Sequence, residues 1–177
     1  MLDSNQIQQY ESTGALLLER VFAQAEVAVL RQAANRVASE DRPNVTPEAD
    51  GSAARMVHGA NAYEPTFGDL CRHPRLIEPA AQLIGSGVYV HQSRLNYNAG
   101  HGTGGFDWHQ DYSTWHKIDG LPNPRAMMIA VFLDEMDATN GPLLYIPGSQ
   151  DEGLIDEFEP VKDAVGNILM KLSTRRL

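Results

Sequence analysis

The chain has 177 residues, of which 42% are hydrophobic and 21% charged, a composition and length that fit one soluble domain with one core. Its formal net charge is −9 and its lysines and arginines are scattered, so no nucleic-acid partner is expected. Cys71 is the only cysteine, and the chain shows no signal-peptide pattern and no apolar run of membrane-spanning length, so we expect a cytoplasmic protein without disulfides or membrane contact.

The first half of the chain is predicted to be mainly helical. Four helices are expected, at residues 4–9, 23–39, 67–71 and 75–84. Ser4 is expected to cap the first helix and Gly14 to end it, while the apolar run at 15–18 is expected to form a buried strand. The second helix is amphipathic, because its apolar residues recur at helical spacing. It should therefore cover one face of the core.

Residues 42–65 contain proline, glycine, asparagine and aspartate without a sustained period. A loop of that length is uncommon inside a compact domain and is often a lid or a binding loop. We therefore expect this segment to move as a lid over a site.

The second half of the chain is predicted to be rich in strands. Four are expected, at residues 88–98, 106–111, 126–135 and 143–146. Helices followed by antiparallel strands predict an α+β domain with a sandwich or jelly-roll core. The expected organisation is a single domain, 1–177, with a helical part at 1–87, a strand-rich part at 88–150 and an unassigned tail at 151–177.

A candidate metal motif lies in the sequence WHQD at residues 108–111. In a strand, His109 and Asp111 would share one face, and together they supply two of the ligands of a two-histidine-one-carboxylate iron site. The alternative is that His109 is a surface histidine beside a solvated aspartate. The His-x-Asp spacing, taken alone, favours this alternative. The preceding Phe-x-Trp indicates a half-buried strand, in which a carboxylate needs a cation.

A second polar constellation lies on the preceding predicted strand. Alternation places Gln92, Arg94 and Asn96 on one face, and an inward-facing Arg94 would need an anionic partner. The pattern supports equally that this face is solvated and that the opposite face is buried. The opposite face carries Tyr89, His91, Leu95 and Tyr97.

Several runs together resemble the phytanoyl-CoA dioxygenase family, in particular its bacterial ectoine-hydroxylase branch. They are FDWHQD at 106–111, TWH at 114–116, DG at 119–120, NGPL at 140–143, IPGS at 146–149 and HQSRLNY at 91–97. The likeness covers roughly residues 6–153 and implies a double-stranded β-helix (jelly-roll) with flanking N-terminal helices. It also implies an oxygenase that uses Fe(II), 2-oxoglutarate and dioxygen to hydroxylate a small polar or amino-acid-like substrate.

The resemblance assigns roles to individual residues. It implies that His109 and Asp111 bind iron, and that Gln92 and Asn96 contact 2-oxoglutarate. It places Trp115 at the substrate pocket. A carboxylate at the position of Asp111 implies hydroxylation rather than halogenation, because it occupies the site that a halide would need.

Further roles are expected for other residues. Arg94 is expected to orient the cosubstrate site, and His116 to line the pocket or support a ligand rather than bind metal. We expect His58, His73 and His91 to be structural. The pair Met127 and Met128 and the ring of Phe132 are expected to pack inside the barrel.

The family also requires a second histidine and then an arginine, both beyond the Pro-Gly-Ser segment, and no histidine follows His116 here. We therefore expect a jelly-roll that is incomplete at the C-terminus, with the third ligand outside this chain. The alternative function is a non-catalytic remnant that acts as a binding or interaction module. Exposed edges of an incomplete barrel would favour a homodimer.

Overall fold

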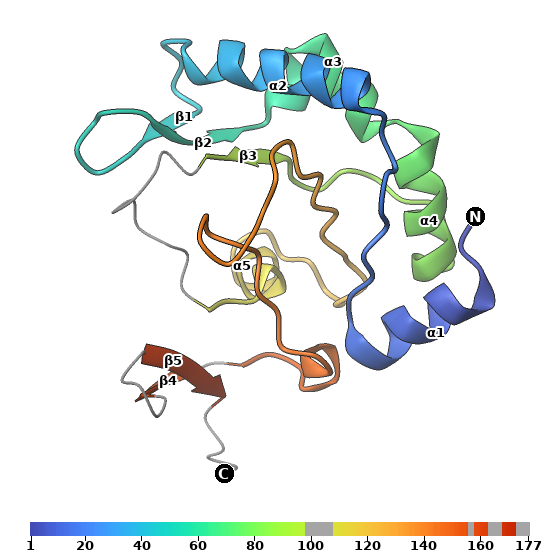
Figure 1. Ribbon diagram of the computed structural model, residues 1–177. Coiled ribbons are helices and arrows are strands. Elements are labelled where there is room, and N and C mark those ends of the chain that lie inside the picture. The colour runs from blue at the N-terminus through green and yellow to red at the C-terminus, as the bar shows by residue number, and fades with distance from the viewer. Residues whose placement is uncertain (98–107, 156–157, 163–167, 173–177) are drawn as a thin grey trace.

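The computed structural model describes residues 1–97 and 108–155, and the backbone of 158–162 and 168–172 (Figure 1). Its helices are α1 (Ser4–Thr13), α2 (Gln24–Ala38), α3 (Pro65–Cys71), α4 (Pro74–Ile84) and α5 (Asp111–Lys117), with the 3-10 helices η1 (Ala60–Ala62) and η2 (Ser149–Asp151). Its strands are β1 (Val45–Pro47), β2 (Ala54–His58), β3 (Arg94–Asn96), β4 (Phe158–Lys162) and β5 (Ile168–Leu172).

The first helix is longer than predicted and has a different cap. Asp3, rather than Ser4, is its N-cap: the Asp3 carboxylate accepts from the amide of Gln6, whose side chain accepts in return from the Asp3 amide. This reciprocal pair satisfies two backbone donors that the first turn would leave without partners. The helix ends at Gly14 as predicted, where φ is +79°.

The apolar run at 15–18 is not a strand. It continues from α1 without regular structure, and the side chain of Leu17 is 68% exposed. A strand needs a neighbouring strand to exchange backbone hydrogen bonds. The two sheets of the described chain are β1-β2-β3 and β4-β5, so this run has no such neighbour there.

The core lies between α2 and the three-stranded sheet. The predicted amphipathic helix is confirmed, and it buries Leu30, Ala33, Ala34 and Val37. Val57 of β2 and Phe67 of α3 complete the buried cluster, against which Leu95 and Tyr97 pack. Figure 1 shows α2 and α3 along one side of this sheet and α5 on the opposite side.

The prediction of an irregular lid at 42–65 is wrong. This segment forms the antiparallel hairpin β1-β2, and β2 is the central strand of the sheet. Val57 is fully buried, and Ala60 is 2% exposed. The segment therefore belongs to the folded core, and turn residues between its short strands gave the appearance of a long loop.

The two later helices of the first half are confirmed, with bounds within two residues of the prediction. Pro65 and Pro74 each occupy the first turn, where a missing amide hydrogen costs nothing. The second of these helices, α4, ends at Gly85, where φ is +73°.

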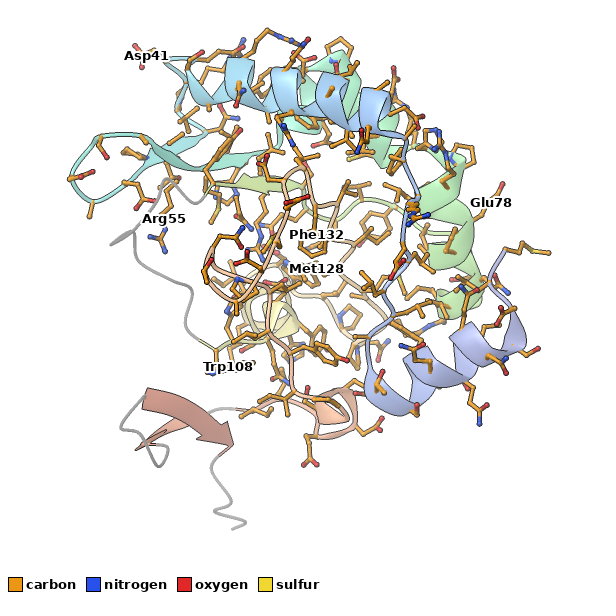
Figure 2. All side chains as sticks on the ribbon, in the orientation of Figure 1. Asp41, Arg55, Glu78, Trp108, Met128 and Phe132 are labelled. Carbon is orange, nitrogen blue, oxygen red and sulfur yellow. The ribbon has the colours of Figure 1, made fainter. Side chains whose placement is uncertain are left out.

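Most strands predicted after residue 88 are absent from the described part. Of 88–98 only Arg94–Asn96 is a strand, and residues 126–135 and 143–146 form no strand. Residues 98 and 106–107 lie outside the described chain. Met128 and Phe132, labelled in Figure 2, are 53% and 43% exposed rather than packed inside a barrel. The described part of the chain thus contains one three-stranded antiparallel sheet, one two-stranded sheet and helices.

The tail at 151–177, unassigned from sequence, contains the antiparallel hairpin β4-β5.

None of the helices in the described ranges has the length and apolar character needed to cross a bilayer.

Candidate functional site

The two predicted iron ligands lie at the start of a helix rather than on a strand. Gln110 is the extended N-cap residue of α5, with φ −112° and ψ 119°, and Asp111 is the first helical residue. A carboxylate is favoured in this first turn because the free amide groups of the helix carry partial positive charge. His109 Nε2 still lies 3.5 Å from Asp111 Oδ1, so the predicted proximity is confirmed while the predicted strand is wrong.

Asp111 also makes the ion pair that the sequence required for Arg94. Arg94 Nη2 donates to both carboxylate oxygens of Asp111, at 2.9 and 3.1 Å. The two side chains are 24% and 20% exposed, so the pair is mostly shielded from water. This contact joins β3 to the first turn of α5.

The donor chemistry of this pair fits two adjacent positions of a transition-metal site. Nitrogen and oxygen ligands each about 2.1 Å from one ion and at right angles lie about 3.0 Å apart. The 3.5 Å between His109 Nε2 and Asp111 Oδ1 is close to that value. Within the described ranges no cluster of three histidine, cysteine or acidic side chains occurs, so a third protein ligand is not among them.

The predicted cosubstrate residues lie on the face of the β3 segment that points away from the core. Leu95 and Tyr97 pack against the core cluster, whereas Tyr89, at 73% exposure, and His91 are exposed. The alternative of a buried opposite face therefore holds for Leu95 and Tyr97 only. On the other face Arg94 reaches Asp111, whereas Gln92 and Asn96 are exposed. The structure therefore brings Arg94, but neither amide, into contact with the metal motif.

The two predicted substrate residues follow on α5. Trp115 is buried, with 9% exposure, and its indole meets the ring of His91 edge to face at 5.3 Å. His116 is exposed, and its Nδ1 lies 2.8 Å from the carbonyl oxygen of Leu121. In this structure His116 thus joins the last turn of α5 to the segment that follows the helix.

Two of the three histidines expected to be structural have side-chain partners among the described residues, and the third lies in a strand. His73 Nδ1 accepts from the amide of Arg75 and caps α4, and His58 lies in β2 opposite Arg94. His91 Nε2 lies 3.0 Å from Asp119 Oδ2.

Sequence reasoning missed Gln110 and Asp119. Gln110 Nε2 donates to the carbonyl oxygen of Gly153 at 2.8 Å, and its Oε1 accepts from the amide of Ile155 at 2.8 Å. Asp119 pairs with His91, 28 residues away. Both interactions join distant segments, so no local spacing signals them.

Known proteins with similar sequences and structures identify the family. Residues 10–167 match the family model described as phytanoyl-CoA dioxygenase (PhyH). The chain is 41% identical over 174 residues to ectoine dioxygenase of Bordetella bronchiseptica, covering 96% of this chain and 56% of that protein. It is 38% identical over 148 residues to L-proline trans-4-hydroxylase of Streptomyces griseoviridis, covering 84% and 55%.

The structural comparison agrees. The crystal structure of EctD from S. alaskensis with 2-oxoglutarate and 5-hydroxyectoine superposes with a TM-score of 0.66 at 34% identity, over 70% of this chain and 45% of that chain. The chain spans about half the length of the curated relatives it matches. A family match over residues 10–167, which is most of the chain, shows that the chain belongs to the phytanoyl-CoA dioxygenase family.

Proposed function

We propose that this chain is part of an Fe(II)- and 2-oxoglutarate-dependent oxygenase that hydroxylates a small polar or amino-acid-like substrate. The observation that carries the proposal is the 3.5 Å approach of His109 Nε2 and Asp111 Oδ1 at the start of α5, in a chain of this family. Its relatives include proteins named ectoine dioxygenase and L-proline trans-4-hydroxylase. Both names describe chemistry on small amino-acid-like molecules, and the complete fold is proposed to be a jelly-roll.

Each site residue has a proposed task. His109 and Asp111 would hold the iron, which when bound activates dioxygen while 2-oxoglutarate is oxidised and decarboxylated. Arg94 holds the Asp111 carboxylate in one orientation through two hydrogen bonds. This keeps the ligand in place before the metal arrives.

The remaining predicted residues would contact the organic molecules. Gln92 and Asn96, on the same face as Arg94, are proposed to donate hydrogen bonds to 2-oxoglutarate. Trp115 and His116 are proposed to line the substrate side of the site. The burial of Trp115 beside His91 supports a fixed apolar wall at that position.

A second candidate function is a binding module without catalysis. It is favoured by the lack, among the described residues, of a group of three side chains that could hold a metal ion. A module of this kind would retain the fold but would not turn over 2-oxoglutarate.

Metal titration tests the ligand pair. Calorimetry under nitrogen with Co²⁺ or Mn²⁺ should show binding to the wild-type chain and none to His109→Ala. His73→Ala removes a histidine from the cap of α4 and should bind metal as the wild type does. Equal affinity in the wild type and His109→Ala would contradict the assignment.

Turnover separates the two functions. Conversion of 2-oxoglutarate to succinate is measured on protein of verified mass, with and without ectoine or L-proline. Turnover that requires His109 supports the oxygenase. Metal binding without turnover favours the binding module, and turnover that survives His109→Ala shows that the ligand set is different.

A further inference from the structure

Helix α5 is joined at both ends to one short segment of chain. Arg94 pairs with Asp111 at its first residue, and His91 pairs with Asp119 just after its last turn. The segment from His91 to Arg94 can span at most about 11 Å, similar to the length of a seven-residue helix at 1.5 Å per residue. One short segment therefore contacts α5 near both of its ends.

The second of these contacts differs from the first because it includes an aromatic side chain. The imidazole of His91 meets the indole of Trp115 at 5.3 Å and 70° and meets the ring of Tyr89 at 6.1 Å and 74°. Edge-to-face pairs at these separations stabilise a defined ring orientation. The same imidazole binds Asp119 through Nε2, so one ring connects the carboxylate to the indole.

Backbone hydrogen bonds hold Asp119 close to Trp115. The carbonyl oxygen of Trp115 accepts from the amide of Asp119 at 3.1 Å and from that of Leu121 at 3.0 Å. Asp119 is thus held close to Trp115 along the chain and bound to His91 across space. The imidazole of His91 thus contacts both the Trp115 indole and the Asp119 carboxylate.

We propose that His91 and Asp119 form a positioning pair that sets the orientation of the Trp115 indole. The inference rests on the proposed function only for the task of Trp115 at the substrate side of the site. Because Arg94 and Asp111 hold the other end of α5, the pair should govern Trp115 without governing the metal ligands. Its loss should weaken substrate binding and leave metal affinity unchanged.

Fluorescence of Trp115 tests the pair directly. The chain has two tryptophans, so Trp108→Phe leaves Trp115 as the only reporter. In that background, His91→Leu and Asp119→Leu should shift the emission to longer wavelength and raise acrylamide quenching several-fold. His91→Gln keeps an N–H donor for Asp119 and should restore quenching to within about twofold of the parent.

A matched control exists at the start of α4. His73 makes a similar edge-to-face contact with Phe22, at 5.3 Å and 77°. His73→Leu should leave the emission and quenching of Trp115 unchanged. Unchanged quenching in His91→Leu, or an equal change in His73→Leu, would overturn the proposal. If His91→Leu fails to fold, Asp119→Asn is measured in its place. A smaller rise in the acrylamide quenching of Trp115 is then expected, and unchanged quenching would overturn the proposal.

Ligand titrations separate this inference from the proposed function. Mn²⁺ affinity should agree within about twofold between the parent and His91→Leu, and its loss in His91→Leu would overturn the independence of the two ends of α5. Binding of ectoine or L-proline, with Mn²⁺ and 2-oxoglutarate present, should weaken about fivefold or more. Increased acrylamide quenching of Trp115 with unchanged binding of ectoine or L-proline would support the positioning pair and contradict the substrate role of Trp115.

Discussion

At the scale of single residues, Asp111 has two partners with different requirements. It is the proposed oxygen ligand of the metal, and it accepts two hydrogen bonds from Arg94. A mostly shielded carboxylate that loses its cation is left with an unfavourable charge. Arg94 therefore matters for stability as well as for the orientation of the ligand.

A double-mutant cycle measures that ion pair. Arg94→Leu and Asp111→Asn should each destabilise the fold, and the coupling between them should be on the order of 1–3 kcal/mol. The measurement is urea unfolding of the wild type, both single variants and the double variant without metal. Additive effects of the two substitutions would show that the contact contributes nothing to stability.

The exposed amides Gln92 and Asn96 carry the proposed binding of 2-oxoglutarate. A hydrogen bond to a charged group contributes about 1.5–3 kcal/mol, so Gln92→Ala or Asn96→Ala should raise the Kd for 2-oxoglutarate roughly tenfold or more. Binding is measured by calorimetry with Mn²⁺ present. Gln32→Ala, on the exposed side of α2, should leave the Kd unchanged. Equal Kd values in all variants would remove both amides from the site.

Tyr97 should give the protein a pH-dependent stability in alkaline solution. Burial, and then the neighbouring Tyr63, raise the pKa of the Tyr97 phenol to about 12. Its hydroxyl donates to the carbonyl oxygen of Ala34 at 2.8 Å. The folded state thus keeps its proton when the unfolded chain, with a tyrosine pKa near 10, has lost it.

The stabilisation from this shift is complete below about pH 10 and disappears as the pH rises towards about 12. Tyr97→Phe should be about 0.5–1.5 kcal/mol less stable at neutral pH, from the lost hydrogen bond, and should lose less stability than the wild type above pH 10. Denaturant unfolding at a series of pH values checks both effects. Parallel pH profiles would contradict the assigned pKa. Tyr10, whose pKa is also raised by burial, remains in both proteins.

At the scale of elements, residues at η2 donate hydrogen bonds to backbone carbonyl groups in the last turn of α1. The amide of Gly148 donates to the carbonyl oxygen of Thr13 at 3.1 Å, and Gln150 Nε2 donates to that of Glu11 at 3.2 Å. Backbone carbonyls of the last turn of a helix otherwise have no partner within the helix. Two segments more than 130 residues apart are joined in this way.

Gly14 should be less tolerant of substitution than Gly85, although both end helices at positive φ. A Cβ at Gly14 would lie 2.3 Å from Gln150 Oε1, while a Cβ at Gly85 would meet nothing within 4 Å. Gly85→Ala should cost about 1–2 kcal/mol for the left-handed backbone alone. Gly14→Ala should cost a further 0.5–1.5 kcal/mol or so, because Gln150 must leave its hydrogen bond.

Thermal or urea unfolding of both glycine variants gives this difference. In a Gln150→Ala background the two alanine substitutions should cost the same. An equal cost in the presence of Gln150 would show that its side chain moves aside freely.

At the scale of the whole molecule, large apolar side chains are exposed on the segments after α5 that form no strand. They are Met128, Ile129, Phe132, Leu143, Leu144 and Tyr145, each between 43% and 66% exposed. Single exposed apolar residues are ordinary, but several in two neighbouring segments favour association. The predicted homodimer therefore remains a prediction with a physical basis.

The 177-residue chain should self-associate in a concentration-dependent way. Light scattering after size exclusion should show a mass that rises with concentration, and Leu143→Lys combined with Leu144→Lys should shift the chain towards monomer. Leu17→Lys, at an equally exposed leucine outside these segments, should not. A constant monomer mass for the wild type would contradict the expectation.

The sequence by itself determined the local features of the helices and the family. The 3.6-residue period of α2 and the glycine that ends α4 are properties of neighbouring residues, and the structure confirms both helices. Several runs between residues 91 and 149 together indicated the family, and the spacing within WHQD placed His109 near Asp111. The helices and the proximity of His109 to Asp111 could be inferred because the interactions that specify them span only a few residues.

Only the tertiary structure decided where the strands lie and which side chains meet at the site. Residues 54–58 became the central strand because β1 and β3 supply its hydrogen-bond partners, while 126–135 remained without one among the described residues. Arg94 contacts Asp111, which is 17 positions away in the sequence, and His91 contacts Asp119, which is 28 positions away. A strand or an ion pair of this kind depends on a partner from a distant segment. Local propensity does not indicate which distant segment lies beside a given residue in the folded protein.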